Sequence, residues 1–369
     1  MYKILIGLFL SVLCLQAKCQ IQFDEGSFTE VLTKAKQEKK MVFMDCYTSW
    51  CGPCKMMVQD VFSREDVGQF MNTHFVNVKL DMEKGEGREL AKKYQVKVYP
   101  TFLILNEDGE VIHKMVGGMK AEEFLQNVQN GIGEHSLYSY EKRYADGERD
   151  PQFVYSYIET LARAFMKERM EEVLHEYWGT LTDQEKSCKE NWMLVKRFVK
   201  NPALPEYKYL LEHKKDFDAA VSKDSVDRKI YDDLFPLIVN DCNEIIFHDK
   251  VNAAELLDTY KTCVTQSGIA GQDYLLDIVE FTKVFLSGDL KKALKMYDKK
   301  FSRLDSDARF DVTLQLNGML IRKGDAKMCK RGLELIEKTM KDCGWSVDDP
   351  LFAAVVSGLK DKFKDDKDE

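Results

Sequence analysis

The sequence has few residues arranged to hold a metal ion. Only one Cys-x-x-Cys pair occurs among its ten cysteines, whereas a structural zinc site needs a second pair of ligands. The histidines are scattered along the chain: His74, His113, His135, His175, His213 and His248. Cys–His protease chemistry has no supporting context either. We therefore expect no metal and no other cofactor.

The chain has no excess of positive charge, and long apolar runs are scarce. The chain carries 54 Lys and Arg against 62 Asp and Glu, a formal charge of −8, which argues against a nucleic-acid surface. After residue 15, no stretch approaches the roughly 18 apolar residues of a transmembrane helix. The sequence therefore predicts neither a nucleic-acid-binding protein nor a membrane-spanning one.

The first residues resemble a targeting segment. A short basic start is followed by the apolar run Ile4–Leu15, and Ala17 and Cys19 occupy positions −3 and −1 of a cleavage site before Gln20. We predict a signal peptide at 1–19 and export, to the periplasm of a Gram-negative bacterium. Cleavage after Ala17 and lipidation of Cys19 are the alternatives.

The most informative motif is Trp50-Cys51-Gly52-Pro53-Cys54-Lys55. Two cysteines at this spacing can alternate between a dithiol and a disulfide. A helix that begins between them lowers the pKa of the first thiol, because unpaired N–H groups and the helix dipole favour an anion. The apolar run Met41–Met44 and then Asp45 precede the motif, and Tyr99-Pro100-Thr101 follows it and opens another apolar run.

These motifs, in this order, resemble the thioredoxin superfamily. The resemblance covers about 20–135 and is greatest to secreted bacterial members related to the periplasmic electron-delivering domain of the transmembrane disulfide reductases. The matching segments are 45–55, 75–81, 94–96, 99–102, 108–110 and 117–118. The resemblance implies an α/β thioredoxin fold, in which helices flank a central mixed sheet, and an oxidoreductase activity.

Apolar periodicity predicts the elements of such a fold. Ser27-x-x-Glu30 is a capping box ahead of a helix, and an Asp-Gly turn at 106–109 joins two strands. Strands are expected at 41–46, 75–81, 102–105 and 111–116, and helices at 51–62 with a continuation at 63–71, at 86–94 and at 121–130.

Strand patterns vanish in the second half of the chain. Glycines and Pro151 mark 136–150 as a linker. Apolar residues at three- and four-residue spacing predict an all-α domain at 151–360, and 361–369 is a charged tail. A loose repeat within this half favours stacked helix hairpins of the tetratricopeptide kind, and an irregular helical bundle is the alternative.

The motif's chemistry follows from thiol–disulfide exchange. Cys51, at a helix N-terminus, is the expected nucleophile and the expected exposed thiol. Cys54, one turn on and more buried, would attack the sulfur of Cys51 and release reduced substrate. Gly52 and Pro53 add no charge that stabilises the thiolate, so they favour a reductase.

The resemblance implies roles for other residues. Asp45 is the buried acid that exchanges a proton with Cys54. The family's buried lysine on the neighbouring strand is matched to Asn77, with Lys79 as a substitute on the same face.

A second group of implied roles concerns substrate binding. The resemblance makes Pro100 a cis proline, and the backbone of Tyr99 then pairs with an extended substrate. Thr101 completes this loop, and Trp50 covers the motif.

The other cysteines are expected to be buried apolar residues rather than ligands. Cys46 is predicted to be a packed thiol, although a second redox step with Cys51 is an alternative. The pairing of five more is left open: Cys188, Cys242, Cys263, Cys329 and Cys343.

The sequence thus predicts an exported oxidoreductase that reduces protein disulfides, with a helical domain that recruits partners. Its expected partners are disulfide-containing proteins and a membrane or soluble electron donor. A protein-binding or chaperone-like scaffold and a disulfide oxidase or isomerase are the alternatives.

Overall fold

The computed structural model describes residues 20–304, 306–346 and 348–364. The predicted signal peptide lies outside these residues, as does the end of the charged tail. The chain divides into two compact units, which meet in the sequence between Leu181 and Thr182.

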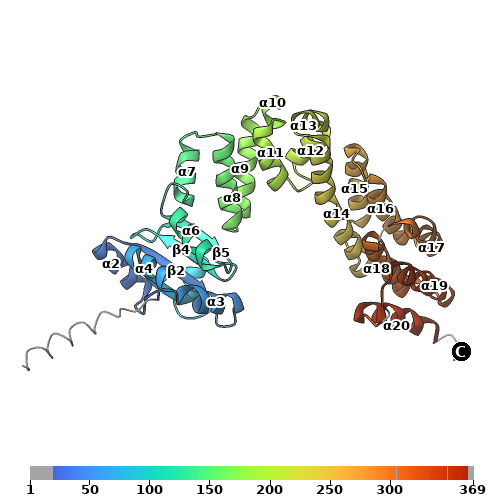
Figure 1. Ribbon diagram of the computed structural model, residues 1–369, viewed down its shortest axis with the longest axis horizontal. Helices are drawn as coiled ribbons and strands as arrows, with labels where there is room; N and C mark the ends of the chain where they lie inside the picture. The colour runs from blue at the N-terminus through green and yellow to red at the C-terminus, as the bar shows by residue number, and fades with distance from the viewer. Residues whose placement is uncertain (1–19, 305, 347, 365–369) are drawn as a thin grey trace, which may run out of the picture. The chain divides into compact units, whose positions relative to one another are not determined.

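A five-stranded mixed sheet forms the centre of the first unit (Figure 1). Its strand order is β1 (Phe23–Asp24), β3 (Phe75–Asp81), β2 (Met41–Tyr47), β4 (Thr101–Leu105) and β5 (Val111–Val116). The first three are parallel, β4 runs antiparallel to them, and β5 runs antiparallel to β4 and so in the direction of the first three. Because β2 and β4 are central, they read as continuous apolar runs in the sequence.

Helices cover both faces of this sheet. One face carries α2 (Phe28–Glu38) and α5 (Gly87–Lys93), and the other carries α3 (Gly52–Met56), the π-helical η1 (Met57–Phe62), α4 (Glu65–His74) and α6 (Ala121–Gly131). The second face buries an aromatic cluster in which Phe43 and Phe102 stack with centroids 5.9 Å apart. The predicted thioredoxin fold is confirmed, including the Ser27–Glu30 capping box. Strand β1, only two residues long, was not predicted.

The first unit extends beyond the predicted domain boundary at residue 135. Residues 137–145, placed in the predicted linker, form α7 (Leu137–Ala145), which packs against β5. Ser136 caps this helix, and the Leu137 N–H donates to His113 Nδ1 of β5 at 3.3 Å. Helices α8 (Pro151–Arg163) and α9 (Lys167–Thr180) continue the same unit. The 136–150 linker is therefore corrected, because buried tyrosines of α7 pack against α8.

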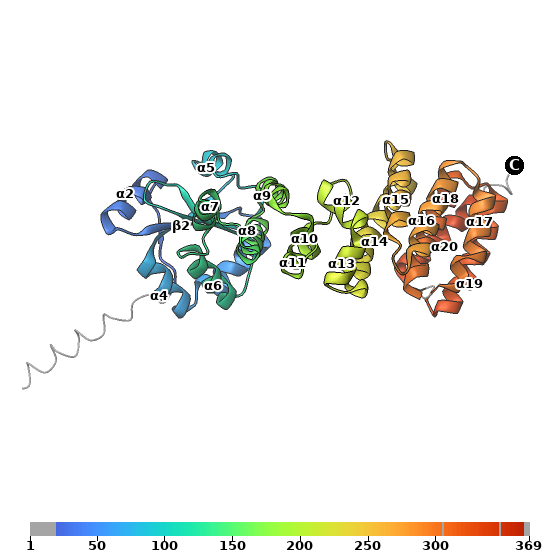
Figure 2. The ribbon, with the colours of Figure 1, turned by 90° about the horizontal axis from the view of Figure 1, so that it is seen from above.

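The described part of the second unit is helical (Figure 2). Its helices are α10 (Asp183–Lys186), α11 (Lys189–Phe198), α12 (Pro205–Glu212), α13 (Lys214–Ala220), α14 (Lys223–His248), α15 (Ala253–Ser267), α16 (Gln272–Leu286), α17 (Leu290–Lys299), the 3₁₀ turn η2 (Phe301–Arg303), α18 (Ser306–Lys323), α19 (Ala326–Cys343) and α20 (Pro350–Lys364). From α15 onward, successive helices pack against one another. A tetratricopeptide-like repeat stays a prediction.

The helices described here include none that is both long and apolar enough to cross a membrane. Five cysteines outside the first sheet are free thiols, of which Cys242, Cys263 and Cys329 are buried and Cys188 and Cys343 are partly buried. Burial raises the pKa of Cys242 to about 12, so this thiol packs as a small apolar residue.

Acid should destabilise the first unit through His113. Burial lowers the pKa of His113 to about 4, below the ordinary value of about 6.5. Protons therefore bind the unfolded chain first as the pH falls, and stability is lost between about pH 6.5 and about pH 4. We expect His113 to contribute a loss of about 2 kcal/mol between about pH 7 and about pH 5, measured as the difference between the wild type and His113→Gln.

Urea unfolding, read by proteolysis and mass spectrometry of first-unit peptides, measures this loss. His113→Gln should remove most of it, whereas His74→Gln, at an exposed histidine of the same unit, should leave it in place. An unchanged acid loss in His113→Gln would contradict the assignment.

Candidate active site

The Cys-x-x-Cys motif lies where β2 passes into α3. Cys51 is the N-cap residue of α3, with extended backbone angles (φ −68°, ψ 108°). Its Sγ accepts a hydrogen bond from the Cys54 N–H at 3.1 Å. Pro53 lies in the first turn, where its missing N–H leaves no helical hydrogen bond unmade. The predicted helix start is therefore confirmed, and the end of the helix dipole lies at the sulfur of Cys51.

Cys51 and Cys54 form a disulfide, and their Cα atoms are 5.4 Å apart. Both residues are buried, with Cys51 2% and Cys54 5% exposed. The prediction that Cys51 is the more exposed thiol is therefore wrong for the oxidised protein. Its sulfur is bonded to Cys54 and faces the helix N-terminus, and this placement keeps it from solvent.

Asp45 is buried within β2, on the sheet face that α3 covers. Alternation along the strand puts it on the side of Phe43, opposite Cys46. It is 2% exposed, and its Oδ1 has no hydrogen-bond partner among the described residues. Burial raises the pKa of Asp45 to about 7, although the charge of Lys79 acts in the opposite direction. Asp45 can therefore gain or lose a proton near neutral pH.

A small cavity joins Asp45 to the disulfide. Its volume is about 80 Å³, and Asp45, Cys54, Thr48 and Lys79 are among its lining residues. The Thr48 hydroxyl is also buried without a hydrogen-bond partner. Two unsatisfied polar groups in a space of this size match what a water molecule requires. The cavity thus offers a path for a proton between Asp45 and Cys54.

The lysine beside Asp45 is Lys79, the residue named above as a substitute for Asn77. In the parallel pairing of β2 with β3, Asp45 lies opposite Lys79, and Asn77 lies opposite Phe43. Lys79, the predicted substitute, is therefore the residue that pairs with Asp45 across the two strands. The Lys79 ammonium lies 4.7 Å from the centre of the Tyr47 ring, at the rim of the same cavity.

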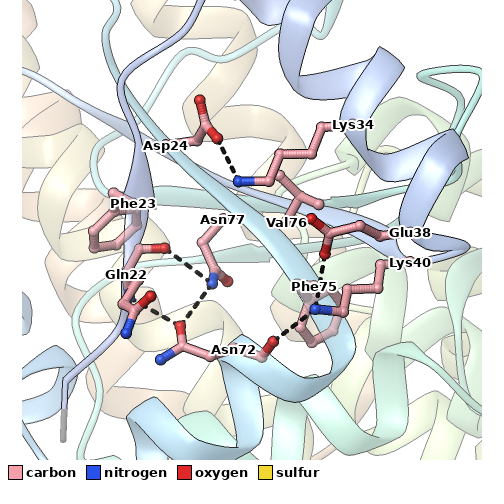
Figure 3. A pocket seen from close by; sticks show the side chains of 10 residues that line it. All are labelled: Gln22, Phe23, Asp24, Lys34, Glu38, Lys40, Asn72, Phe75, Val76 and Asn77. Atoms are coloured by element: carbon pink, nitrogen blue, oxygen red, sulfur yellow. Dashed lines mark hydrogen bonds and ion pairs between the residues drawn. The ribbon is translucent and has the colours of Figure 1, made fainter. Parts of the chain in front are cut away.

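Asn77 lines a different pocket, shown in Figure 3. Its amide donates to the backbone oxygen of Gln22 at 3.3 Å and to Asn72 Oδ1 at 3.1 Å. These bonds tie the residue before β1 and the end of α4 to β3. Asn77 therefore supports the sheet, and it does not line the cavity that Asp45 and Cys54 share.

The loop before β4 has the predicted cis bond between Tyr99 and Pro100. Tyr99 packs edge-to-face against Trp50, with ring centroids 6.1 Å apart. Trp50 is 64% exposed, and its indole N–H donates to Glu83. Thr101 is buried, and its hydroxyl donates to the Val98 carbonyl at 2.7 Å. Trp50 and Tyr99 thus form an aromatic rim in which Trp50 is exposed. No sequence motif indicated the part of Glu83.

Cys46 is a free, buried thiol one residue after Asp45. Burial and then the neighbouring Asp45 charge raise its pKa well above the ordinary value. It packs in the core on the sheet face opposite Asp45, in agreement with the predicted packed thiol.

Residues 28–132 match a family model described as a thioredoxin-like domain. A chloroplastic thioredoxin Y from Oryza sativa subsp. japonica is 32% identical, over 29% of this chain and 58% of its own. An H-type thioredoxin from Oryza sativa subsp. indica is 37% identical, over 30% and 82%. Bacillus subtilis thioredoxin is 37% identical, over 28% and 91%. This chain thus spans less than two thirds of the first of these relatives.

Among solved structures, a proposed disulphide-isomerase from Bacteroides thetaiotaomicron is 50% identical to this chain. The match covers 31% of this chain and 93% of that one, with a TM-score of 0.29.

Replacing Asp45 should stabilise the oxidised protein in alkaline solution. Its folded pKa of about 7 lies above the ordinary value of about 3.9, so the native state binds the proton more tightly and stability falls as the pH rises between these values. Asp45 should contribute a loss of about 3 kcal/mol between about pH 5 and about pH 8, measured as the difference between the wild type and Asp45→Asn.

The same urea-proteolysis measurement tests this expectation. Asp81→Asn is the matched control: a hydrogen bond from Lys84 lowers the pKa of Asp81, so its replacement should leave the loss between pH 5 and pH 8 in place. An Asp45→Asn variant whose stability changes between pH 5 and pH 8 by the same amount as that of the wild type would contradict the assignment.

Proposed function

The chain belongs to the thioredoxin family, and on this premise we propose that it is an exported oxidoreductase that reduces protein disulfides through Cys51 and Cys54. The observation that carries the proposal is the buried Asp45, which shares a cavity with Cys54. An acid that titrates near neutral pH beside the second cysteine suits a dithiol that must release and regain protons.

In the first step, the Cys51 thiolate of the reduced protein attacks one sulfur of a substrate disulfide. A bond forms between Cys51 and that sulfur, the substrate S–S bond breaks, and the other substrate sulfur leaves as a thiolate that takes a proton. The N–H of Cys54, which points at Cys51 Sγ, stabilises the attacking anion. The loop at Tyr99 and Pro100, with the exposed Trp50 ring, receives the substrate chain.

In the second step, Cys54 attacks the sulfur of Cys51. Asp45 takes the proton of Cys54 through the shared cavity, and Lys79 stabilises the resulting carboxylate. The mixed disulfide breaks, the second substrate thiolate leaves, and the Cys51–Cys54 disulfide forms. The substrate gains two electrons and the protein loses two, so an external dithiol donor must reduce the protein before the next turnover.

Export and partner recruitment complete the proposal. Export is supported by the basic start and the apolar run Ile4–Leu15, and the periplasm would supply protein disulfides as substrates. Helical arrays commonly present surfaces that bind proteins, so we assign the second unit to holding substrates or the electron donor.

Replacing Cys54 tests the order of attack. Cys54→Ser should accumulate a mixed disulfide between Cys51 and substrate, because the resolving thiol is missing. Cys51→Ser should form no such adduct on the same time scale. Incubation of each reduced variant with oxidised insulin, followed by non-reducing electrophoresis and mass spectrometry, measures both.

Adducts on Cys54 in the Cys51→Ser variant, formed as fast as those on Cys51 in Cys54→Ser, would reverse the two roles. Absence of adducts in both variants would contradict the proposed disulfide reduction.

A further inference from the structure

A second cavity lies beside the loop that carries the cis proline. Its volume is about 310 Å³, and all its lining residues belong to the first unit. Val98 and Thr101, on either side of Tyr99 and Pro100, form part of one wall. The connection between α8 and α9 forms the opposite wall, which lies beyond the 28–132 segment matched by the thioredoxin-like family model. The cavity is thus built jointly by the thioredoxin fold and by an addition to it.

Phe165 occupies this added wall in a conformation that a bulky residue rarely adopts. Its φ is +55°, in the left-handed region, where helix ends usually place glycine. Its ring is 63% exposed, so core packing does not account for it. Backbone strain of this kind often accompanies function, and here the strained residue places an aromatic ring at a cavity beside the site.

Lys114 supplies an uncompensated positive charge on the sheet side. It is partly buried, its ammonium donates to the Gln95 carbonyl at 3.3 Å, and burial lowers its pKa. Lys97 lies in the same cavity. Within the described part of the chain, no carboxylate forms an ion pair with either lysine. A partly buried cation of this kind gains most from a ligand carboxylate.

The charges of the opposite wall are already matched or solvated. Arg169 pairs with Glu141 at 2.8 Å and with Glu172 at 3.2 Å, and contacts Glu176 at 3.6 Å. Glu168 is exposed to water, so its repulsion of an incoming anion is weak. The positive charges that lack a carboxylate partner among the described residues are therefore those on the sheet side of the cavity, Lys114 and Lys97.

We propose that this cavity is a specificity pocket that receives a glutamate side chain of the substrate polypeptide, close in sequence to the cysteine that Cys51 attacks. The aliphatic stem of the glutamate would contact Phe165 and Val116, and its carboxylate would pair with Lys114. The inference rests on the proposed function, because the occupant must be a chain bound along the loop at Tyr99 and Pro100.

Paired peptide substrates test the pocket. Disulfide-bonded peptides carry one glutamate moved residue by residue along both flanks of the cysteine, each matched by a glutamine peptide. For at least one position, the reduced full-length protein should show a kcat/KM about tenfold higher for the glutamate peptide. Lys114→Gln should bring this ratio close to one, and Lys114→Arg should restore part of it.

Two further variants separate recognition from folding. Lys142→Gln removes an equal charge from an exposed lysine of α7 and should keep the tenfold ratio. Phe165→Gly relieves the left-handed strain, so the unit should unfold at no lower urea concentration, while KM for the preferred peptide should rise several-fold. If the KM of Phe165→Gly is unchanged, the Phe165 ring does not contact the bound glutamate, and this part of the proposed pocket is overturned.

Reduction of the small disulfide 5,5′-dithiobis(2-nitrobenzoate) by the wild-type protein distinguishes two failures. If this disulfide is reduced but no peptide position shows a glutamate preference, or if Lys114→Gln keeps the preference, the specificity pocket is overturned and the proposed function stands. If neither the small disulfide nor any peptide is reduced, both are overturned.

Discussion

The burial of one carboxyl group is the constraint on which the site depends. Asp45 lies in the central strand with an oxygen that no described residue satisfies, and an unpaired buried polar group costs about 1–3 kcal/mol. Substituting an apolar residue would remove this cost, yet the carboxyl group lies on the cavity that Cys54 also lines. We infer that the fold tolerates a less stable strand because the second cysteine needs a proton acceptor that titrates near neutral pH.

The surrounding elements position Asp45 and the two cysteines relative to one another. Strand β2 ends at Tyr47, the short turn after it brings Cys51 to the N-terminus of α3, and the Cys54 N–H is thereby directed at the first sulfur. Strand β3 places Lys79 opposite Asp45. The loop before β4 then brings Tyr99 to Trp50, and α8 and α9 add a second wall beyond it. The extension of the first unit therefore bears directly on how a substrate chain could lie near the disulfide.

Local patterns predicted much of this, and non-local pairings did not. The bounds of β3 and β5 and the Ser27 capping box were correct because alternation and capping depend on neighbouring residues. The choice between Asn77 and Lys79 as the partner of Asp45 stayed open because parallel register depends on how two distant strands align. Glycines around 136–150 suggested a linker, although Ser136 and the tyrosines that follow it could have indicated a capped helix. The burial of Cys51 follows from the disulfide itself, a state that the sequence does not specify.

The reduction potential of the Cys51–Cys54 pair tests the central claim, that this dithiol works as a reductant, most directly. The mature-length protein would be equilibrated in defined thiol–disulfide buffers, and the fraction of alkylated cysteines in the peptide that contains both would be read by mass spectrometry. The uncharged Gly52 and Pro53 predict a reducing couple, near the value of about −270 mV typical of thioredoxins. A potential near the value of about −120 mV typical of strong periplasmic oxidants would contradict the account and place the protein among the enzymes that form disulfides.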